Sequence, residues 1–77
     1  MSASGDAIVV DARGHRCPVP ALRLRRAMAV AEPGSRVTLL ADDPLAKVDV
    51  PHLAAALGWS LVEIHSEGAV LRFMLRA

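Results

Sequence analysis

Residues 21–41 read ALRLRRAMAVAEPGSRVTLLA, and this stretch decides the fold. Its first half consists of strong helix formers. The apolar residues there recur three and four positions apart, at Ala21, Leu24, Met28 and Ala31. Pro33-Gly34 ends the helix, and the short apolar run at 36–41 is typical of a well-buried strand. The stretch therefore predicts an amphipathic helix that leads through a tight turn into a buried strand.

A further strand is expected on the amino-terminal side of this stretch. Ile8, Val9 and Val10 are residues that favour a strand, and Gly14 lies where that strand would have ended. A helix is then expected to follow Cys17, because a proline directly after it suits the opening of a helix.

A second helix and two strands are expected on the carboxy-terminal side. We expect Asp49 to cap the helix and Gly58 to end it. Its inner face would consist of Val50, Leu53, Ala54 and Leu57. Residues 59–65 and 69–76 then read as strands, joined by Ser66-Glu67-Gly68 in an antiparallel hairpin.

The predicted order is β-α-β-α-β-β, which indicates an α/β fold. Both helices would cover one face of a mixed four-stranded sheet in a two-layer sandwich. The first two strands should be parallel, because a right-handed helical crossover joins them. We expect residues 1–6 to form a flexible leader and residues 7–77 a single domain.

Composition excludes several classes of protein. Hydrophobic residues make up 53% of the 77 positions, which is enough for one core and argues against disorder. Nine basic residues face eight acidic ones and aromatics are 3%, so we expect no direct binding to nucleic acid. No apolar run approaches the roughly 18 to 20 residues that a membrane span requires. A single cysteine forms no internal disulfide, and residues 1–7 do not read as a signal peptide, so we expect a cytoplasmic protein. We also expect it to act as a monomer.

Cys17 is the candidate reactive residue of this sequence. Its expected place at the amino end of a helix favours a thiolate, and Arg13, Arg16 and protonated His15 would add positive potential. We therefore expect a lowered thiol pKa and an exposed sulfur. The alternative is that Cys17 is a small buried hydrophobe, as lone cysteines often are.

Other chemistries fit the residues less well. Dithiol redox chemistry requires a second cysteine, and the chain has one. Metal binding by Cys17, His15, His52 and His65 lacks any recognised ligand spacing, so no metal is expected. A cysteine hydrolase would need a base that a third group orients, and only His15 is near in sequence. Asp42, Asp43 and Asp49 are interpreted as turn and cap residues.

A surface beside Cys17 is a candidate for partner docking. It consists of Arg13, Arg16, Val19, Leu22, Arg23 and Arg26. The helical members share one side, rotated away from the apolar stripe that the core requires. Arginines around an apolar pair would suit brief contact with an acidic partner. The alternative is an ordinary solvated surface.

Residues 11–20, DARGHRCPVP, resemble the signature of the TusA/SirA-type sulfur-carrier family, whose motif is Cys-Pro-x-Pro after a strand and a glycine. The likeness continues through residues 41–44, ADDP, and residues 49–51, DVP, to Gly58. The resemblance implies the fold predicted above. It also implies that Cys17 accepts sulfane sulfur as a persulfide, with Gly14, Pro18 and Pro20 as supporting motif residues.

The resemblance further implies partners and no cofactor. Members receive sulfur from a cysteine desulfurase or a rhodanese-type enzyme and pass it to relay proteins for tRNA thiolation, molybdenum cofactor synthesis or sulfur oxidation. His15 stands where members often have an apolar residue, and Ala54 where some have a second cysteine. Sulfur would then leave Cys17 only to a partner or a small thiol, by sulfurtransferase-type chemistry whose status as enzyme or carrier stays open. The alternatives are thiosulfate or selenium handling, and a non-catalytic regulatory or nucleic-acid-binding adaptor.

Overall fold

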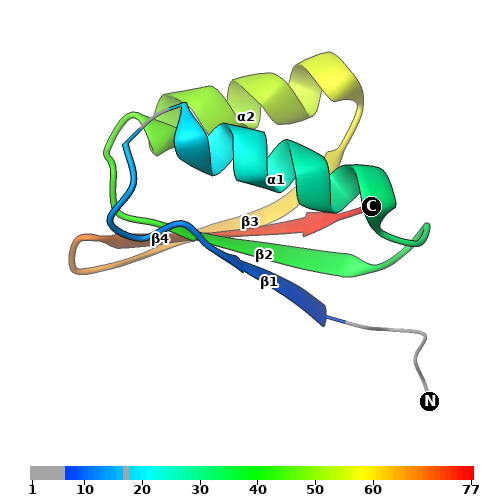
Figure 1. The fold of residues 1–77 in the computed structure, drawn as a ribbon, viewed down its shortest axis with the longest axis horizontal. Coiled ribbons are helices and arrows are strands. Elements are labelled where there is room, and N and C mark those ends of the chain that lie inside the picture. Colours follow the sequence, from blue (N-terminus) through cyan, green and yellow to red (C-terminus); the bar gives the residue numbers. More distant parts are fainter. Residues whose placement is uncertain (1–6, 17) are drawn as a thin grey trace.

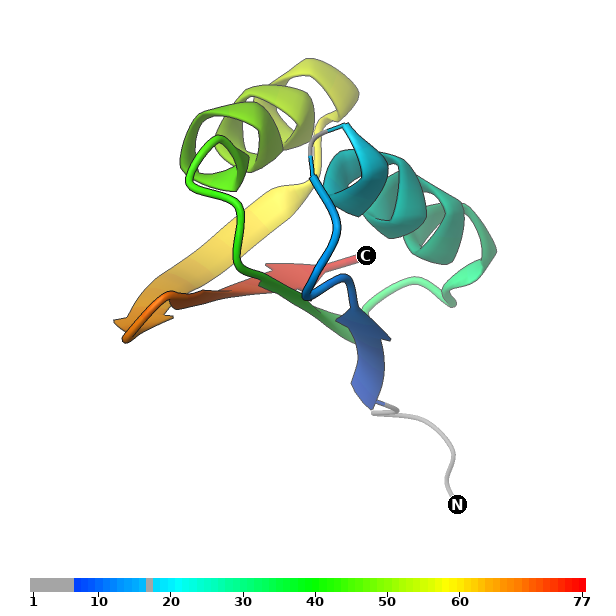
Figure 2. The same ribbon diagram turned by 60° about the vertical axis from the view of Figure 1, so that its left-hand side comes forward.

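The computed structural model describes residues 7–16 and 18–77. Its elements follow the predicted order and are β1 (Ala7–Asp11), α1 (Val19–Val30), β2 (Arg36–Ala41), α2 (Ala46–Leu57), β3 (Ser60–Glu67) and β4 (Val70–Arg76). The two helices lie side by side over one face of the sheet (Figure 1, Figure 2). The predicted two-layer α/β sandwich is confirmed.

The sheet is mixed, with the strand order β1-β2-β4-β3. β1 and β2 are parallel, as expected for strands that a helical crossover joins. β2 also pairs antiparallel with β4, and β3 pairs antiparallel with the other side of β4. β2 is therefore an interior strand, held by hydrogen bonds on both sides.

The core fills the space between the helices and the sheet. α1 contributes Pro20, Leu24 and Met28. Leu24 and Met28 belong to the predicted stripe, whereas its outer members Ala21 and Ala31 are half-buried. The inward residues of β2 and β4 alternate along each strand and are Val37, Leu39, Ala41, Leu71, Phe73 and Leu75. The residues between them face the side of the sheet that no described helix covers. The hydrophobic burial that stabilises this domain is thus concentrated on one face.

The predicted start of the second helix is wrong. α2 begins at Ala46, so Asp49 lies in its first turn and does not cap it. Asp43 starts the turn instead, because its Oδ1 accepts the Leu45 N–H at 3.0 Å and its carbonyl accepts the Ala46 N–H at 2.9 Å. Pro51 lies inside the helix, where its missing N–H leaves the carbonyl of Lys47, an exposed residue, without its helical donor.

The end of α2 is as predicted, and its inner face is narrower than predicted. Gly58 has a left-handed backbone, and its N–H donates to the Ala54 carbonyl. Val50 and Ala54 are buried, whereas Leu57 is 42% exposed. α2 therefore covers the sheet with three small or branched buried residues, Ala46, Val50 and Ala54.

The hairpin of β3 and β4 is tighter than predicted. Ser66 and Glu67 belong to β3, and Glu67 pairs with Val70, so only Gly68-Ala69 forms the turn. Gly68 has a φ of 62°, and no residue other than glycine has a positive φ among the described residues. A glycine of positive φ at the first turn position is the pattern of a type II′ hairpin.

A matched pair of substitutions on α1 tests this core. Leu24→Ala removes a fully buried side chain and should lower the free energy of unfolding by about 2–5 kcal/mol, because it leaves a cavity. Leu22→Ala, at a 57% exposed position two residues away, should change it by no more than about 0.5 kcal/mol. Urea denaturation measures both. Equal losses from the two variants would contradict the orientation of α1.

Candidate functional site

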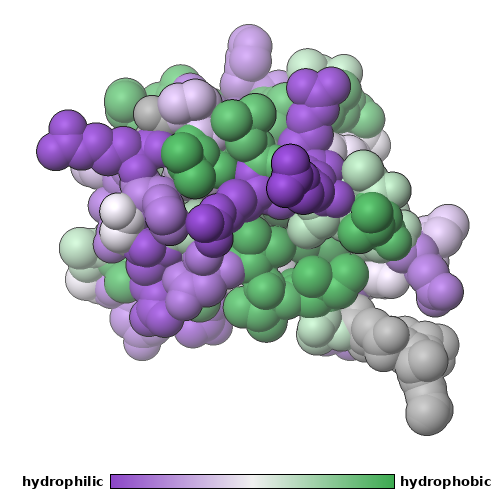
Figure 3. Space-filling view, viewed as in Figure 1, coloured by the Kyte–Doolittle hydropathy of each residue, from purple (hydrophilic) through white to green (hydrophobic). Residues whose placement is uncertain are grey.

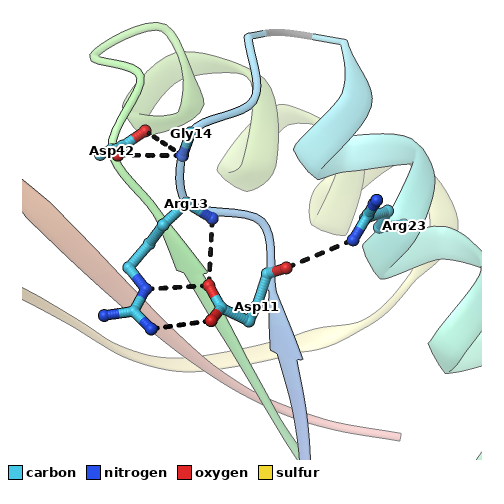
Figure 4. Close-up of polar contacts among 5 residues, drawn as sticks. All are labelled: Asp11, Arg13, Gly14, Arg23 and Asp42. Atoms are coloured by element: carbon cyan, nitrogen blue, oxygen red, sulfur yellow. Dashed lines mark hydrogen bonds and ion pairs between the residues drawn. The ribbon is translucent and has the colours of Figure 1, made fainter.

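The loop between β1 and α1 begins with a close ion pair. Arg13 Nη2 lies 2.7 Å from Asp11 Oδ2, and Arg13 Nε donates to Asp11 Oδ1 at 2.9 Å (Figure 4). The Arg13 backbone N–H donates to the same Oδ1 at 3.1 Å. The side-chain hydrogen bonds and then the backbone bond from Arg13 lower the pKa of Asp11 to about 2. The charge of Arg13 is therefore balanced by Asp11, the last residue of β1.

The next residue, Gly14, is fastened to a distant part of the chain. Its N–H donates to both Oδ1 and Oδ2 of Asp42, each at 3.0 Å (Figure 4). Asp42 directly follows β2 and lies 28 residues from Gly14. The turn at this point also has the His15 N–H donating to the Ala12 carbonyl at 3.2 Å. Gly14 has a φ of 84°, a conformation that side-chain-bearing residues rarely adopt.

A cleft separates the two loops that lead to the helices. Its volume is about 500 Å³, and it is lined by Gly14, His15, Arg16, Asp42, Asp43, Pro44 and Leu45. One wall therefore comes from the loop before α1 and the other from the loop before α2. The walls carry both basic and acidic groups, so the cleft has no single sign of charge.

Cys17 itself lies outside the described residues, and its expected exposure and thiol pKa stay predictions. Its two chain neighbours, Arg16 and Pro18, are exposed. The Val19 N–H donates to the Arg16 carbonyl at 2.9 Å, and the Leu22 N–H donates to the Pro18 carbonyl at 3.0 Å. α1 begins at Val19, inside the Cys-Pro-x-Pro motif, so a helix starts two residues after Cys17, where the sequence predicts one.

The two prolines of the motif take different positions. Pro18 occupies the cap position of α1 and supplies no side-chain hydrogen bond. Pro20 is the second residue of the helix and is fully buried. At these positions a missing N–H costs little, since the first N–H groups of a helix have no partner within it. Pro20 therefore anchors the start of α1 in the core.

The predicted docking residues are divided between different parts of the surface. One hollow of about 150 Å³ is lined by Val19, Leu22, Arg23 and Arg26. Arg16 instead lines the cleft between the loops, and Arg13 is paired with Asp11. Figure 3 shows apolar side chains interrupted by hydrophilic ones on the face that α1 and β1 present. We call the surface formed by Val19, Leu22, Arg23 and Arg26 the docking hollow, after the docking role that the sequence predicts for it.

Arg23 also has a structural contact. Its Nη1 donates to the Asp11 carbonyl at 3.3 Å, which links α1 to the end of β1 (Figure 4). For Arg26 no salt bridge to a described residue is formed. The docking hollow thus combines one tethered arginine with one that projects freely, beside the exposed Leu22.

Among the described residues we find neither a metal site nor a membrane-spanning helix. His15, His52 and His65 lie on the first loop, α2 and β3, and no group of three metal-ligating side chains forms among residues 7–16 and 18–77. Over the same ranges, neither helix has the length and apolar character needed to cross a membrane.

The sequence did not reveal that Asp42 forms a hydrogen bond with the loop before α1. Asp42 and Asp43 were interpreted together as turn residues, which describes the contact of Asp43 with the Leu45 N–H. Asp42 instead bonds across to Gly14. The spacing of 28 residues carries no local signal, and the available hint was that both residues belong to motif blocks shared with the resembled family.

Comparison with known proteins agrees with the resemblance seen in the sequence. A protein of Archaeoglobus fulgidus named "Putative sulfur carrier protein" is 46% identical over 68 residues, which cover 87% of this chain and 88% of that protein. The crystal structure of a SirA-like protein from Desulfitobacterium hafniense matches with a TM-score of 0.80 and 29% identity, covering 91% of this chain and 96% of that one. The family model described as Sulfurtransferase TusA matches residues 8–77. The chain therefore belongs to the TusA sulfurtransferase family.

Proposed function

We propose that this protein is a sulfur carrier that binds sulfane sulfur as a persulfide on Cys17 and delivers it to a partner protein. The observation that supports this most is the family match over residues 8–77, which includes the one cysteine of the chain. The relative from Archaeoglobus fulgidus, named as a sulfur carrier, adds to it. Arg16 and Pro18, the described neighbours of Cys17 in the chain, are exposed, which supports the expected accessibility of Cys17.

The transfer is an exchange at sulfur. The Cys17 thiolate attacks the terminal sulfur of a donor persulfide, a bond forms between that sulfur and Cys17 Sγ, and the donor's sulfur–sulfur bond breaks. The donor leaves as a thiolate, and the proton of its persulfide stays on the transferred sulfur. Delivery is the same step with an acceptor thiolate as the attacking group. No electrons are gained or lost overall, so the step needs no redox cofactor or metal.

The absence of a second cysteine decides how the sulfur leaves. Ala54, where some members of the family have a cysteine, is 3% exposed and packs in the core. With a single cysteine in the sequence, no internal thiol is available to attack the persulfide. Sulfur must therefore pass to a thiol of another molecule. A cysteine desulfurase or a rhodanese-type enzyme is the proposed donor, and a relay protein with a reactive cysteine is the proposed acceptor.

Partners are proposed to dock on the docking hollow and the adjoining loop. Leu22 is 57% exposed and offers an apolar contact, and Arg23 and Arg26 flank it. Arg13 contributes less than its sequence position suggests, because Asp11 balances its charge. A contact made by so few side chains suits a transient encounter, in which positive charge speeds association with an acidic partner.

The first test is the mass of the protein after sulfur loading. Incubation with a cysteine desulfurase and cysteine should add one sulfur atom, and dithiothreitol should remove it, because a persulfide is reduced by thiols. Cys17→Ser should prevent the gain. Mass spectrometry of the intact protein measures both. The proposal fails if the serine variant gains the same mass, or if the native chain gains none.

The second test concerns the reactivity of Cys17. A thiol at a helix start beside Arg16 is expected to be alkylated by iodoacetamide with a half-maximal rate below pH about 8.5, the value for a free cysteine. The rate falls at low pH because the thiolate is the nucleophile. A midpoint at or above that value would contradict activation of the thiol.

The third test reverses charge in the docking hollow. Arg23→Glu combined with Arg26→Glu should slow loading from the desulfurase by about tenfold at low salt and weaken its dependence on salt, because steering of an acidic partner is lost. The control is Arg36→Glu combined with Arg76→Glu, which changes the net charge equally at exposed residues paired at the other end of β2 and β4. Equal slowing by both double variants would refute this docking site.

A further inference from the structure

The loop that leads to Cys17 is tied to the second loop of the site through Asp42. Within residues 12–16, the Ala12 N–H extends the β1-β2 ladder by donating to the Leu40 carbonyl at 2.8 Å. Beyond that point the chain leaves the sheet. The next contact between described residues that joins it to the β2-α2 connection is the Gly14 N–H to the Asp42 carboxylate, 3.0 Å to each oxygen.

Asp42 is well placed to hold this loop because its own position is fixed by the core. It directly follows Ala41, the last residue of β2, which is fully buried and pairs with Leu71 of β4. β2 is an interior strand, so its end has little freedom to move. The neighbouring Asp43 accepts the Leu45 N–H at the start of α2 through its Oδ1. The Asp42 carboxylate thus reaches the loop before α1 from a fixed point at the end of β2.

The backbone conformation of Gly14 explains why its N–H is bonded by a side chain. With a φ of 84°, the chain reverses at Gly14, and its N–H is directed to a side-chain acceptor from the second loop. A Cβ at Gly14 would meet nothing within 4 Å, so the residue is needed for its backbone conformation and not for space. The turn and the carboxylate together fix the direction of the chain three residues before Cys17.

We propose that Asp42 is a positioning residue for sulfur transfer between proteins, acting through Gly14 to hold the Cys17 loop in register with the docked partner. This inference rests on the proposed function. A docked partner holds its own reactive sulfur in one place, so the carrier's sulfur must be presented within a narrow range of positions. A small reagent approaches from any direction and has no such requirement. Asp42 therefore controls transfer from a protein donor far more than it controls the intrinsic reactivity of the thiol.

The experiment compares two reactions of the same cysteine. For the native chain, Asp42→Ala and Asp42→Asn, we measure the rate constant for loading from a persulfurated cysteine desulfurase and divide it by the rate constant for alkylation with iodoacetamide at the same pH. The ratio removes any change in the thiolate fraction. For Asp42→Ala it should fall by at least about tenfold, because the loop loses its anchor. Asp42→Asn should restore most of the ratio, since its amide oxygen still accepts the Gly14 N–H.

Additional variants separate positioning from folding. All measurements are made well below the unfolding temperature of each variant. Gly14→Ala strains the same turn while keeping the carboxylate, so it should also lower the ratio, and combining it with Asp42→Ala should add little, because both release one loop. If Asp42→Ala does not fold, Gly14→Ala and Asp42→Asn carry the test.

Each outcome has a distinct meaning. A folded Asp42→Ala variant with the native ratio overturns the positioning role and leaves the sulfur chemistry of Cys17 standing. An Asp42→Asn variant as slow as Asp42→Ala also overturns it, because charge and not the hydrogen bond would then be responsible. A native chain that never gains sulfur, or a Cys17→Ser variant that does, overturns the proposed function and this inference with it.

Discussion

Burial on one side of the sheet is the constraint on which the rest of the structure depends. A chain of 77 residues supports one core, and here that core lies between a four-stranded sheet and two helices that pack on the same face. α1 carries the chain from the end of β1 back to the start of β2, so the two strands run parallel, and such helical crossovers are right-handed in nearly all proteins. Leu24 of α1 and Phe73 of β4 occupy the centre of this layer and are fully buried.

Parallel strands bring the candidate site together. The carboxyl ends of β1 and β2 lie at one edge of the sheet, and each is followed by a loop that rises to the helix layer (Figure 2). These loops form the two walls of the cleft, and Asp42 of one reaches Gly14 of the other. The neighbours of Cys17 in the chain therefore lie where two helix entrances meet. The same topology that closes the core also brings the loop that leads to Cys17 within hydrogen-bonding distance of the loop before α2.

Local patterns in the sequence predicted most of the fold, and the errors occurred where tertiary contacts outweighed those patterns. The stripe of α1 and the alternation in β4 are periodic, so the two elements were correctly placed. The start of α2 is predicted too late because Asp49 is of a residue type that favours helix caps, whereas Asp43 begins the turn several residues earlier. The site was predicted in part: the motif located the loop, while the bond from Asp42 joins residues too far apart for any periodicity to reveal.

The start of α1 is stabilised by apolar packing and not by a helix cap, and this has a consequence for the proposed function. A side-chain cap or an acidic residue in the first turn usually stabilises a helix start by about 0.5–2 kcal/mol. α1 has neither, because Pro18 stands at the cap position and the first turn holds no acid. Burial of Pro20 and Leu24 holds this end in place instead. An acidic side chain there would repel a thiolate or persulfide anion, so anchoring the helix through apolar packing leaves its positive end available to the anion that the proposed chemistry forms.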